Sequence, residues 1–254
     1  MTATSGRFRT TGAVHVWHGR AGDRLLPLDA ALLSDDELRL VRSRSGRQAA
    51  AAHYAGAHAA VRRILGGHYL GVPPEAVRFG RHACPRCGDL GHGRPRIVGP
   101  VTVLDFSLSR SGPYWLLAVT AGTRVGADIE QRTGIDRIIE DALTDDELAR
   151  MLSTDPLEER QKLFYRAWTR KEAVLKACGV GVVADLRALD VSPAEAGPVT
   201  VEHTEPAVAG RWHVQDLGLP PGLSGALAQE AGSVRSVVLR EQDGVSAAHG
   251  AGRA

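Results

Sequence analysis

The chain has 254 residues, of which 43% are hydrophobic and 24% charged, and its 31 basic and 29 acidic residues give a net charge of +2. This balance is typical of a folded globular protein and excludes a wholly disordered chain. So small a net charge excludes a global attraction to nucleic acid or membranes, and no apolar run approaches the roughly 20 residues that span a bilayer. Three cysteines are too few for a disulfide framework, and the polar start does not resemble a signal peptide. We therefore expect a cytoplasmic protein.

A six-residue motif that occurs twice suggests an internal duplication. Residues 33–38 read LSDDEL, and residues 143–148 read LTDDEL, 110 positions later. Each motif places a Ser or Thr three residues before a Glu, the capping box that opens a helix. A second match follows at an offset of 114, and its pairs are Tyr54 with Trp168, His58 with Glu172, Ala59 with Ala173, and Arg62 with Lys176.

The same order of elements recurs around both motifs. A strand-like run precedes each capping box, AVHVW at residues 13–17 and RVGADIE at residues 124–130. We therefore predict an α/β fold of the α+β type, with two similar halves related by a pseudo-twofold axis. A turn-prone triplet ending at residue 113 sets the boundary, so the predicted halves are residues 13–112 and 113–240. Residues 1–12 and 241–254 are small and polar and are predicted to be disordered.

Two carboxylates stand two residues apart in the second strand-like run. Residues i and i+2 of a strand point to one face, so Asp128 and Glu130 should project together while Ile129 enters the core. Adjacent unpaired carboxylates repel each other, and oxygen ligands of this kind suit Mg²⁺ together with substrate phosphates. The alternative is a solvated strand end with surface ion pairs.

An amphipathic helix is predicted for residues 164–179, with the final glycine as its stop. Glu172 and Lys176 lie four residues apart and share a face of this helix, as an ordinary surface ion pair would. An ordinary surface ion pair does not explain why Trp168, one of four Trp in the chain, lies one helical turn before Glu172. Lys171 and Lys176 are two of only three lysines in the chain, which suggests a position that needs an ammonium group instead of a guanidinium.

These segments closely resemble the paired signature of the 4′-phosphopantetheinyl transferases, namely GADIE at residues 126–130 followed by WTRKEAVLKACG at residues 168–179. FSLSRSG at residues 106–112 is similar to that family's F-N-x-S-H-S-G segment, and GRP at residues 93–95 is similar to its G-K/R-P segment. The resemblance covers about residues 13–240. It points to the larger, surfactin-type class, a monomer built from two similar halves.

The resemblance implies an enzyme that moves the phosphopantetheine arm of coenzyme A to a serine of an apo acyl or peptidyl carrier protein and releases adenosine 3′,5′-bisphosphate. By residue, Asp128, Glu130 and Glu172 would hold Mg²⁺, with Mn²⁺ as an alternative ion. Glu172 would also take the serine proton, directly or through a water. Lys176 would contact the pyrophosphate and stabilise the leaving phosphate. The second half would thus carry the metal and catalytic motifs.

The same resemblance assigns coenzyme A recognition largely to basic residues of the first half and the central segment. The candidates are Arg94, Ser109, Arg110 and Lys176. The chain departs from the family pattern at Arg110, where the family usually has His, and at Ser107, where it often has Asn.

A long basic helix is predicted for residues 42–65, in a place where family helices contact the 3′-phosphate of coenzyme A. Its basic residues are Arg42, Arg44, Arg47, His53, His58, Arg62 and Arg63. Arg47 and His53 are the candidates for the phosphate, against the alternative of a solvated basic face.

A cysteine–histidine cluster occupies residues 82–92. Cys84, Cys87 and His92 have the C-x₂-C-x₄-H spacing of the first three ligands of a zinc knuckle, and His82 could be a fourth. No cysteine stands where a knuckle would close. We therefore favour reduced thiols in a tight turn over structural zinc, with a redox pair as the third interpretation.

Two alternative functions rest on other features. A zinc-knuckle nucleic-acid-binding module would use this cluster and neighbouring arginines, but the near-neutral charge and 5% aromatic content argue against it. A non-catalytic coenzyme A-binding protein would have no need for three carboxylates beside a diphosphate. We therefore predict a monomeric transferase whose partners are coenzyme A and apo carrier proteins, and neither nucleic acid nor membrane.

Overall fold

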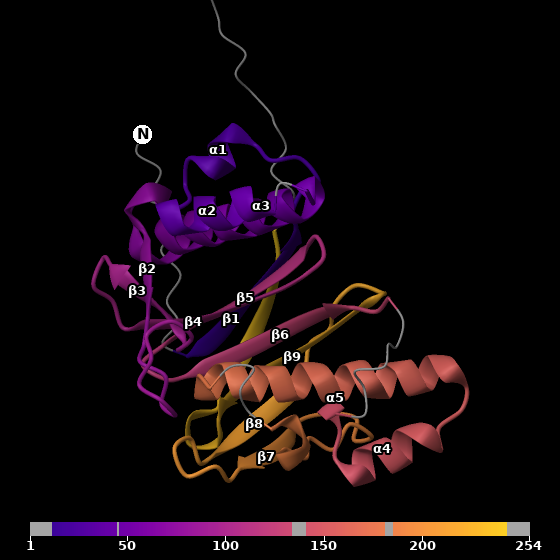
Figure 1. Ribbon diagram of the computed structural model, residues 1–254. Coiled ribbons are helices and arrows are strands. Elements are labelled where there is room, and N and C mark those ends of the chain that lie inside the picture. The colour runs from indigo at the N-terminus through magenta and orange to yellow at the C-terminus, as the bar shows by residue number, and fades with distance from the viewer. Residues whose placement is uncertain (1–11, 45, 134–140, 181–184, 243–254) are drawn as a thin grey trace, which may run out of the picture.

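The computed structural model describes residues 12–44, 46–133, 141–180 and 185–242. Within these ranges the chain forms two four-stranded sheets with helices packed against them (Figure 1). This confirms the predicted α/β class with two sheet-bearing halves. Most of the predicted disordered ends lie outside the described residues. Glu241, predicted to belong to the disordered tail, instead ends a strand.

The first sheet combines strands from both ends of the chain. Its order is β10-β1-β5-β4, with β1 parallel to β10 and antiparallel to β5. Its strands are β1 (Ala13–Arg20), β4 (Leu104–Ser111), β5 (Tyr114–Ala121) and β10 (Ser236–Glu241). The C-terminal strand therefore completes the sheet of the first half.

The second sheet is antiparallel throughout and has the order β6-β9-β8-β7. Its strands are β6 (Val125–Gln131), β7 (Val199–His203), β8 (Gly210–Asp216) and β9 (Leu223–Glu230). In the first half β1 pairs with β5, which pairs with β4; in the second half β6 pairs with β9, which pairs with β8. This shared pairing order supports the predicted duplication.

The chain passes from one sheet to the other between Ala121 and Val125, and not at the predicted boundary after Gly112. Gly112 has a φ of +55°, a left-handed conformation that glycine adopts readily, in the tight turn between β4 and β5. A turn-prone triplet is as typical of a hairpin as of a domain boundary, and here it joins two paired strands of one sheet.

The helices of the first half lie over one face of the first sheet (Figure 1). They are α1 (Pro27–Ala30), α2 (Asp35–Ser43) and α3 (Gln48–Ile64), followed by a π-helical turn η1 (Leu65–Leu70) and a 3₁₀ turn η2 (Pro74–Ala76). The predicted capping box opens α2, since Ser34 and Glu37 each accept a hydrogen bond from the other's amide. The single basic helix predicted for residues 42–65 is wrong. Two helices form instead, and Arg44 and Arg47 lie in the connection between α2 and α3, which also contains Gly46.

The described residues of the second half form the α-helices α4 and α5. Their bounds, with those of two 3₁₀ turns, are α4 (Asp145–Leu152), α5 (Leu157–Cys178), η5 (Leu186–Ala188) and η6 (Ala231–Ser233). The predicted capping box of Thr144 and Glu147 opens α4, and α5 stops at Gly179 as predicted. However, α5 begins two turns before the predicted start at Phe164. Its first turns are polar and follow Pro156, so they lack the apolar spacing that marks the rest.

Gly126 determines how closely α5 approaches β6. A Cβ built at this position would lie 1.9 Å from the carbonyl oxygen of Ala173 and 2.5 Å from the amide nitrogen of Ala177. Only glycine permits this contact between the two backbones. The contact brings the helical turn that contains Glu172 against the strand that carries Asp128.

A separate hairpin formed by β2 (Arg78–Arg81) and β3 (Pro95–Gly99) lies beside the first sheet, and its long loop carries the cysteine–histidine cluster. Apolar clusters fill the space between α3 and the first sheet, between α5 and the second sheet, and between the two sheets. None of the helices in the described ranges combines the length and apolar character needed to cross a bilayer.

Candidate active site

The two halves meet at a seam between β4 and β6, where side chains of β4 accept hydrogen bonds from backbone amides of β6. Successive side chains of a strand alternate between its faces, so alternate residues of β4 can all reach β6. Side-chain oxygens of Asp105, Ser107 and Ser111 accept hydrogen bonds from the amides of Val125, Ala127 and Gln131, each with an N···O distance of 3.0 Å. These side chains therefore stand where the carbonyl groups of a neighbouring strand would stand in a continuous sheet.

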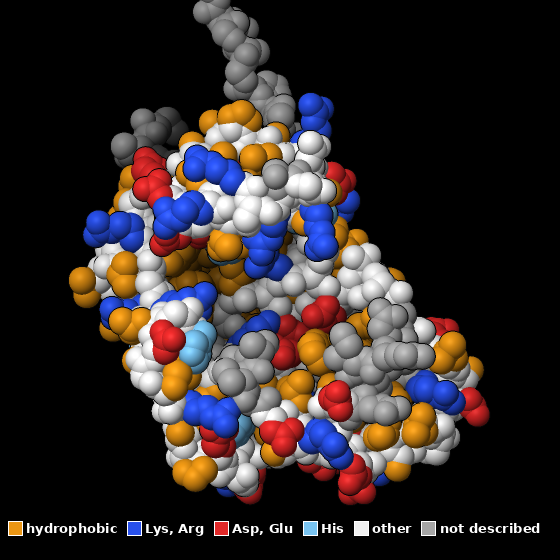
Figure 2. All heavy atoms as spheres, viewed as in Figure 1, with side chains coloured by type: hydrophobic (Ala, Val, Ile, Leu, Met, Phe, Trp, Pro, Cys, Tyr) orange, Lys and Arg blue, Asp and Glu red, His pale blue; other side chains and the backbone are white. Residues whose placement is uncertain are grey.

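A cavity of about 500 Å³ opens beside this seam. Its lining comes from β4 (Leu108, Ser109, Arg110), β6 (Asp128, Glu130), α5 (Trp168, Glu172, Leu175, Lys176) and η5 (Leu186). Figure 2 shows a hollow on this face, with Lys and Arg side chains along the edge nearest α2 and α3 and acidic side chains toward α5. The structure thus brings the predicted metal ligands and the predicted lysine to one cavity.

Asp128 is buried, with 2% of its surface exposed. Its Oδ1 atom accepts hydrogen bonds from the Ser109 hydroxyl, at 2.6 Å, and from the Lys176 ammonium group. Its Oδ2 atom is buried and has no hydrogen-bond partner among the described residues. Because a buried carboxylate oxygen without a partner is costly, this atom requires a cation or a donor from the cavity.

Glu130 and Glu172 are half-buried beside Asp128. Burial and the charge of Asp128 raise the pKa of Glu130, and a hydrogen bond from Ser111 opposes this effect. Burial and the charge of Asp128 also raise the pKa of Glu172, against the opposing charge of Lys176. Three carboxylates therefore share one cavity, and their repulsion disfavours the ionised forms unless a cation neutralises them.

These carboxylates fit a hard divalent cation by their chemistry, because Mg²⁺ prefers oxygen ligands. The Oδ2 atom of Asp128, which has no hydrogen-bond partner within the described ranges, supports this fit. Their oxygens are nevertheless more widely spaced than one ion requires. Among the described residues, Cys84, Cys87 and His92 have ligand atoms that all lie within 4.8 Å of one another. The three carboxylates do not form such a set. Lys176 holds one oxygen of Asp128 and offsets part of the repulsion.

A second group of cations lies on the first-half side of the cavity. The guanidinium groups of Arg44 and Arg110 lie over the ring of Tyr54, 4.8 and 4.6 Å from its centroid. The Nη1 atom of Arg44 is buried and finds no hydrogen-bond partner in the described ranges. The sequence marks Arg44 only as one of several basic residues, since no local pattern indicates that α3 and β4 meet at Tyr54.

Comparison with known proteins assigns the chain to a family. The sequence profile of the 4′-phosphopantetheinyl transferase superfamily matches residues 124–230. The 4′-phosphopantetheinyl transferase HetI of Nostoc sp. is 32% identical over 222 residues, which cover 80% of this chain and 82% of that protein. The chain belongs to the 4′-phosphopantetheinyl transferase superfamily.

Further matches agree with this assignment in sequence. The 4′-phosphopantetheinyl transferase psf-1 of Bacillus pumilus is 33% identical over 135 residues, or 52% of this chain and 54% of that protein. The holo-[acyl-carrier-protein] synthase of Thermotoga maritima overlaps 42% of this chain and 62% of its own in structure. The TM-score of this pair is 0.30, and the sequence identity is 16%. The resemblance found in the sequence is confirmed, and with it the enzyme: a phosphopantetheinyl transferase that uses coenzyme A and modifies carrier proteins.

The residues predicted to bind coenzyme A in this transferase fall into two groups. Three of them line the cavity: Ser109, Arg110 and Lys176. The other three lie outside its lining. Arg94 forms a salt bridge with Asp105 at 2.7 Å, and His53 Nε2 lies 2.7 Å from Asp23 Oδ1. Arg47 is exposed at the N-cap of α3.

Lys171, the other lysine in the last turns of α5, does not reach the cavity. Its side chain is fully buried, and its ammonium group contacts Glu147 at 2.5 Å and the carbonyl oxygen of Leu186 at 2.8 Å. Glu147 also accepts hydrogen bonds from the amides of Thr144 and Val191. Lys171 therefore connects α5 with α4 and η5 inside the transferase and does not enter the cavity.

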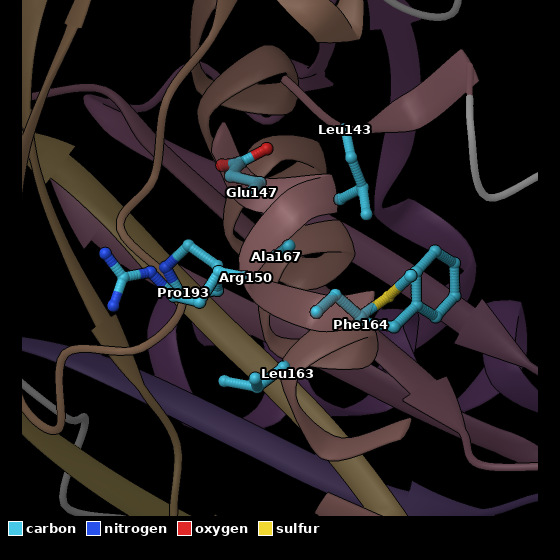
Figure 3. Close-up of a pocket in the computed structure, with 8 residues that line it drawn as sticks. Leu143, Glu147, Arg150, Leu163, Phe164, Ala167 and Pro193 are labelled. Carbon is cyan, nitrogen blue, oxygen red and sulfur yellow. The ribbon is translucent and has the colours of Figure 1, made fainter. Parts of the chain in front are cut away.

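A smaller hollow between α4 and α5 is too narrow for a water molecule. Figure 3 shows Leu143, Ala167 and Phe164 among its apolar lining, with Glu147 toward one end. This hollow belongs to the packing of the two helices and lies apart from the carboxylates of the transferase cavity.

The cysteine–histidine cluster lies in the β2–β3 loop. Cys84 is buried, Cys87 is exposed, and both are free thiols. Desolvation opposes ionisation of Cys84, but backbone hydrogen bonds from Arg86 and Cys87 lower the pKa of its thiol. His82, predicted as a fourth ligand, is not part of the convergent set. The charged groups that surround its imidazole are Arg94, Asp105 and Arg96.

Proposed function

We propose that this transferase binds Mg²⁺ through Asp128, Glu130 and Glu172, and that Glu172 and Lys176 are its catalytic residues. The observation that carries the proposal is the buried Oδ2 atom of Asp128, which has no hydrogen-bond partner in the described part of the chain and lies in a cavity lined also by the other three side chains. Attack on a phosphoryl group depends on positioning and charge neutralisation more than on covalent chemistry. This cavity has side chains for both.

The three carboxylates would hold the ion, with Mn²⁺ as an alternative to Mg²⁺. When bound, the ion neutralises negative charge on the pyrophosphate of coenzyme A. Ser109 and Lys176 fix the carboxylate of Asp128, and the Ser111 hydroxyl donates to Glu130 at 2.5 Å. Side chains of β4 and α5 thus orient Asp128 and Glu130, two of the three proposed metal ligands.

Glu172 accepts the proton of the carrier serine, directly or through a water. The serine oxygen bonds to the phosphorus that bears the pantetheine arm, the bond from that phosphorus to the bridging oxygen breaks, and adenosine 3′,5′-bisphosphate leaves. Burial of Glu172, the first cause of its raised pKa, favours the protonated form and so favours acceptance of the serine proton.

Lys176 stabilises the departing phosphate. Its ammonium group lies 2.8 Å from the Ser109 hydroxyl and contacts Asp128, yet 29% of its side chain is exposed. An ammonium group held at the cavity wall can offset negative charge that develops on the leaving oxygen.

The arginines that flank Tyr54 would bind the remaining phosphate of coenzyme A. A guanidinium group can bind phosphate through two parallel hydrogen bonds, and the buried Nη1 atom of Arg44 has no partner among the residues that the structure describes. Arg110 reaches both the cavity lining and Tyr54. We assign this role to Arg44 and Arg110 instead of Arg47 and His53.

One chain contributes both walls of the cavity, so no second copy is needed to complete it. We therefore propose that the enzyme acts as a monomer. The first half would bind coenzyme A, and the second half would supply the metal ligands and the base.

Carrier modification tests the assigned roles. We expect Asp128→Asn and Glu172→Gln to lower transfer by about 100-fold or more, because each removes a charge needed in the transition state. The measurement is the mass gain of an apo carrier protein incubated with coenzyme A and Mg²⁺, using carriers of the fatty-acid, polyketide and nonribosomal peptide types.

The matched control is Glu202→Gln, which removes a carboxylate that is 67% exposed on β7. This variant should retain wild-type transfer. The roles are wrong if either active-site variant, folded as judged by thermal denaturation, modifies the carrier at near the wild-type rate.

A further inference from the structure

The β2–β3 loop folds its C-x₂-C segment into a tight turn, whose residues are not among those that line the transferase cavity. The Gly88 amide donates to the Cys84 carbonyl oxygen at 2.8 Å, and the Cys84 amide donates to the Asp89 carbonyl oxygen at 2.9 Å. Gly88 has a φ of +76°, which glycine adopts without strain. The amides of Arg86 and Cys87 donate to the Cys84 sulfur. The turn is thus built around a sulfur atom that accepts hydrogen bonds.

His92 approaches this turn from the returning part of the loop. Its Nε2 atom lies 3.3 Å from Cys87 Sγ, and the ligand atoms of Cys84, Cys87 and His92 all lie within 4.8 Å of one another. Zinc bonds of about 2.3 Å to sulfur and about 2.0 Å to nitrogen, at the tetrahedral angle, separate those two atoms by about 3.5 Å. The observed spacing is therefore close to that of ligands to one tetrahedral ion.

Asp89 lies next to this set. Its Oδ2 atom is 3.8 Å from His92 Nε2, and its Oδ1 atom accepts a hydrogen bond from the Gly91 amide at 2.6 Å. A carboxylate oxygen is an accepted zinc ligand beside sulfur and imidazole. His82 is a poorer candidate, because the charged groups around its imidazole are Arg94, Asp105 and Arg96, whereas the Asp89 carboxylate lies beside His92.

We propose that Cys84, Cys87 and His92 bind one zinc ion, with the Asp89 carboxylate as the fourth ligand. Thiolate and imidazole ligands select zinc, whereas Mg²⁺ prefers sites made of oxygen. Reduced thiols in a tight turn, the interpretation that the sequence favours, do not explain why an imidazole from beyond the turn meets the same point.

The ion would stabilise the loop that leads into the seam between the halves. Arg86, within the turn, pairs with Glu205 of the second half at 3.2 Å. Arg94, two residues after His92, forms its salt bridge with Asp105 of β4. The zinc site is therefore structural and independent of the magnesium proposal.

Metal analysis of the full chain tests this proposal. Protein loaded with zinc and then freed of excess metal should retain one zinc per chain by mass spectrometry of the elements. Exchange for Co²⁺ should produce a thiolate-to-cobalt charge-transfer band, which a carboxylate site cannot give. Cys87→Ser, at an exposed position, should lose both signals, and chelation should lower the Tm of the wild type but not that of this variant.

Two variants serve as controls. Cys178→Ala changes the remaining cysteine, which is buried in α5, and Asp128→Asn changes only the transferase site; both should retain zinc. Asp89→Asn should lose zinc faster than the wild type during dialysis against a chelator. A folded wild type without zinc after loading, or a Cys87→Ser variant with stoichiometric zinc and the cobalt band, overturns the site. Unchanged retention in Asp89→Asn overturns the fourth ligand.

Discussion

At the scale of single residues, the transferase cavity concentrates negative charge where solvent is partly excluded. Burial is the main cause that raises the pKa of Glu130 and Glu172, and the charge of Asp128 comes second. When the pKa in the folded protein exceeds the unfolded value, the group stabilises the fold in its protonated form. That contribution is present below the unfolded pKa and is lost as the pH rises through the raised pKa.

We expect Mg²⁺ to increase the Tm near neutral pH and to lose this effect as the pH falls toward 4.5, the ordinary pKa of the two glutamates. The ion binds the ionised carboxylates and removes their repulsion, whereas protons do so in acid. Thermal denaturation with and without Mg²⁺ across this pH range measures the effect. A gain that does not depend on pH, or one that Asp128→Asn leaves undiminished, contradicts the metal site.

At the scale of helices and strands, both halves attach their long helix in the same way. The capping-box residue Glu37 of α2 accepts hydrogen bonds from His58 and Arg62 of α3. The equivalent Glu147 of α4 pairs with Lys171 of α5. Each glutamate therefore opens a short helix and also anchors a long one. The partners stand at different positions, because the offset of 114 pairs His58 with Glu172 and Arg62 with Lys176, and neither with Lys171.

The pair of Glu147 and Lys171 should contribute strongly to stability, because both side chains are almost fully buried. Lys171→Met would leave Glu147 buried without its cation, and we expect it to reduce the free energy of unfolding by about 3–5 kcal/mol. Lys162→Met, on the same helix, breaks only exposed ion pairs and should cost about 1 kcal/mol or less. Urea denaturation of both variants measures the difference, and equal losses would refute the bracing role.

The contact of α5 with β6 should depend on Gly126. We expect Gly126→Ala to destabilise the protein by about 1–3 kcal/mol and to lower transfer, because the added Cβ must push α5, and Glu172 with it, away from Asp128. Gly218→Ala adds a Cβ with no neighbour within 4 Å and should be nearly neutral. Denaturation and carrier modification measured together test this. Wild-type activity in Gly126→Ala would show that the close approach is unnecessary.

At the scale of the whole molecule, the cavity exists because strands that are distant in sequence are brought together. β10 returns from the C-terminal end to pair with β1, so the second half completes the sheet of the first. The side chains of β4 then bond to the amides of β6, and the cavity opens at this seam. The site thus depends on the mutual position of the two halves.

Several features follow from local patterns and could be predicted from the sequence. Asp128 and Glu130 line the cavity while Ile129 packs between the sheets, as the two-residue period of a strand requires. Both capping boxes form where Ser34 and Thr144 precede a glutamate by three residues. The family follows from short motifs whose spacing survives in the chain.

Other features depend on register and packing between distant segments, which no local pattern specifies. The strand containing Ser109 carries no signal that it faces Asp128, and Arg44 carries none that it meets Tyr54. A lysine in a polar helical stretch looks the same whether it faces a cavity, as Lys176 does, or is buried, as Lys171 is. Patterns within single segments therefore indicate the elements, and the resemblance of short motifs indicates the family. The long-range contacts, whose energies depend on the whole fold, establish which side chains meet and where the site opens.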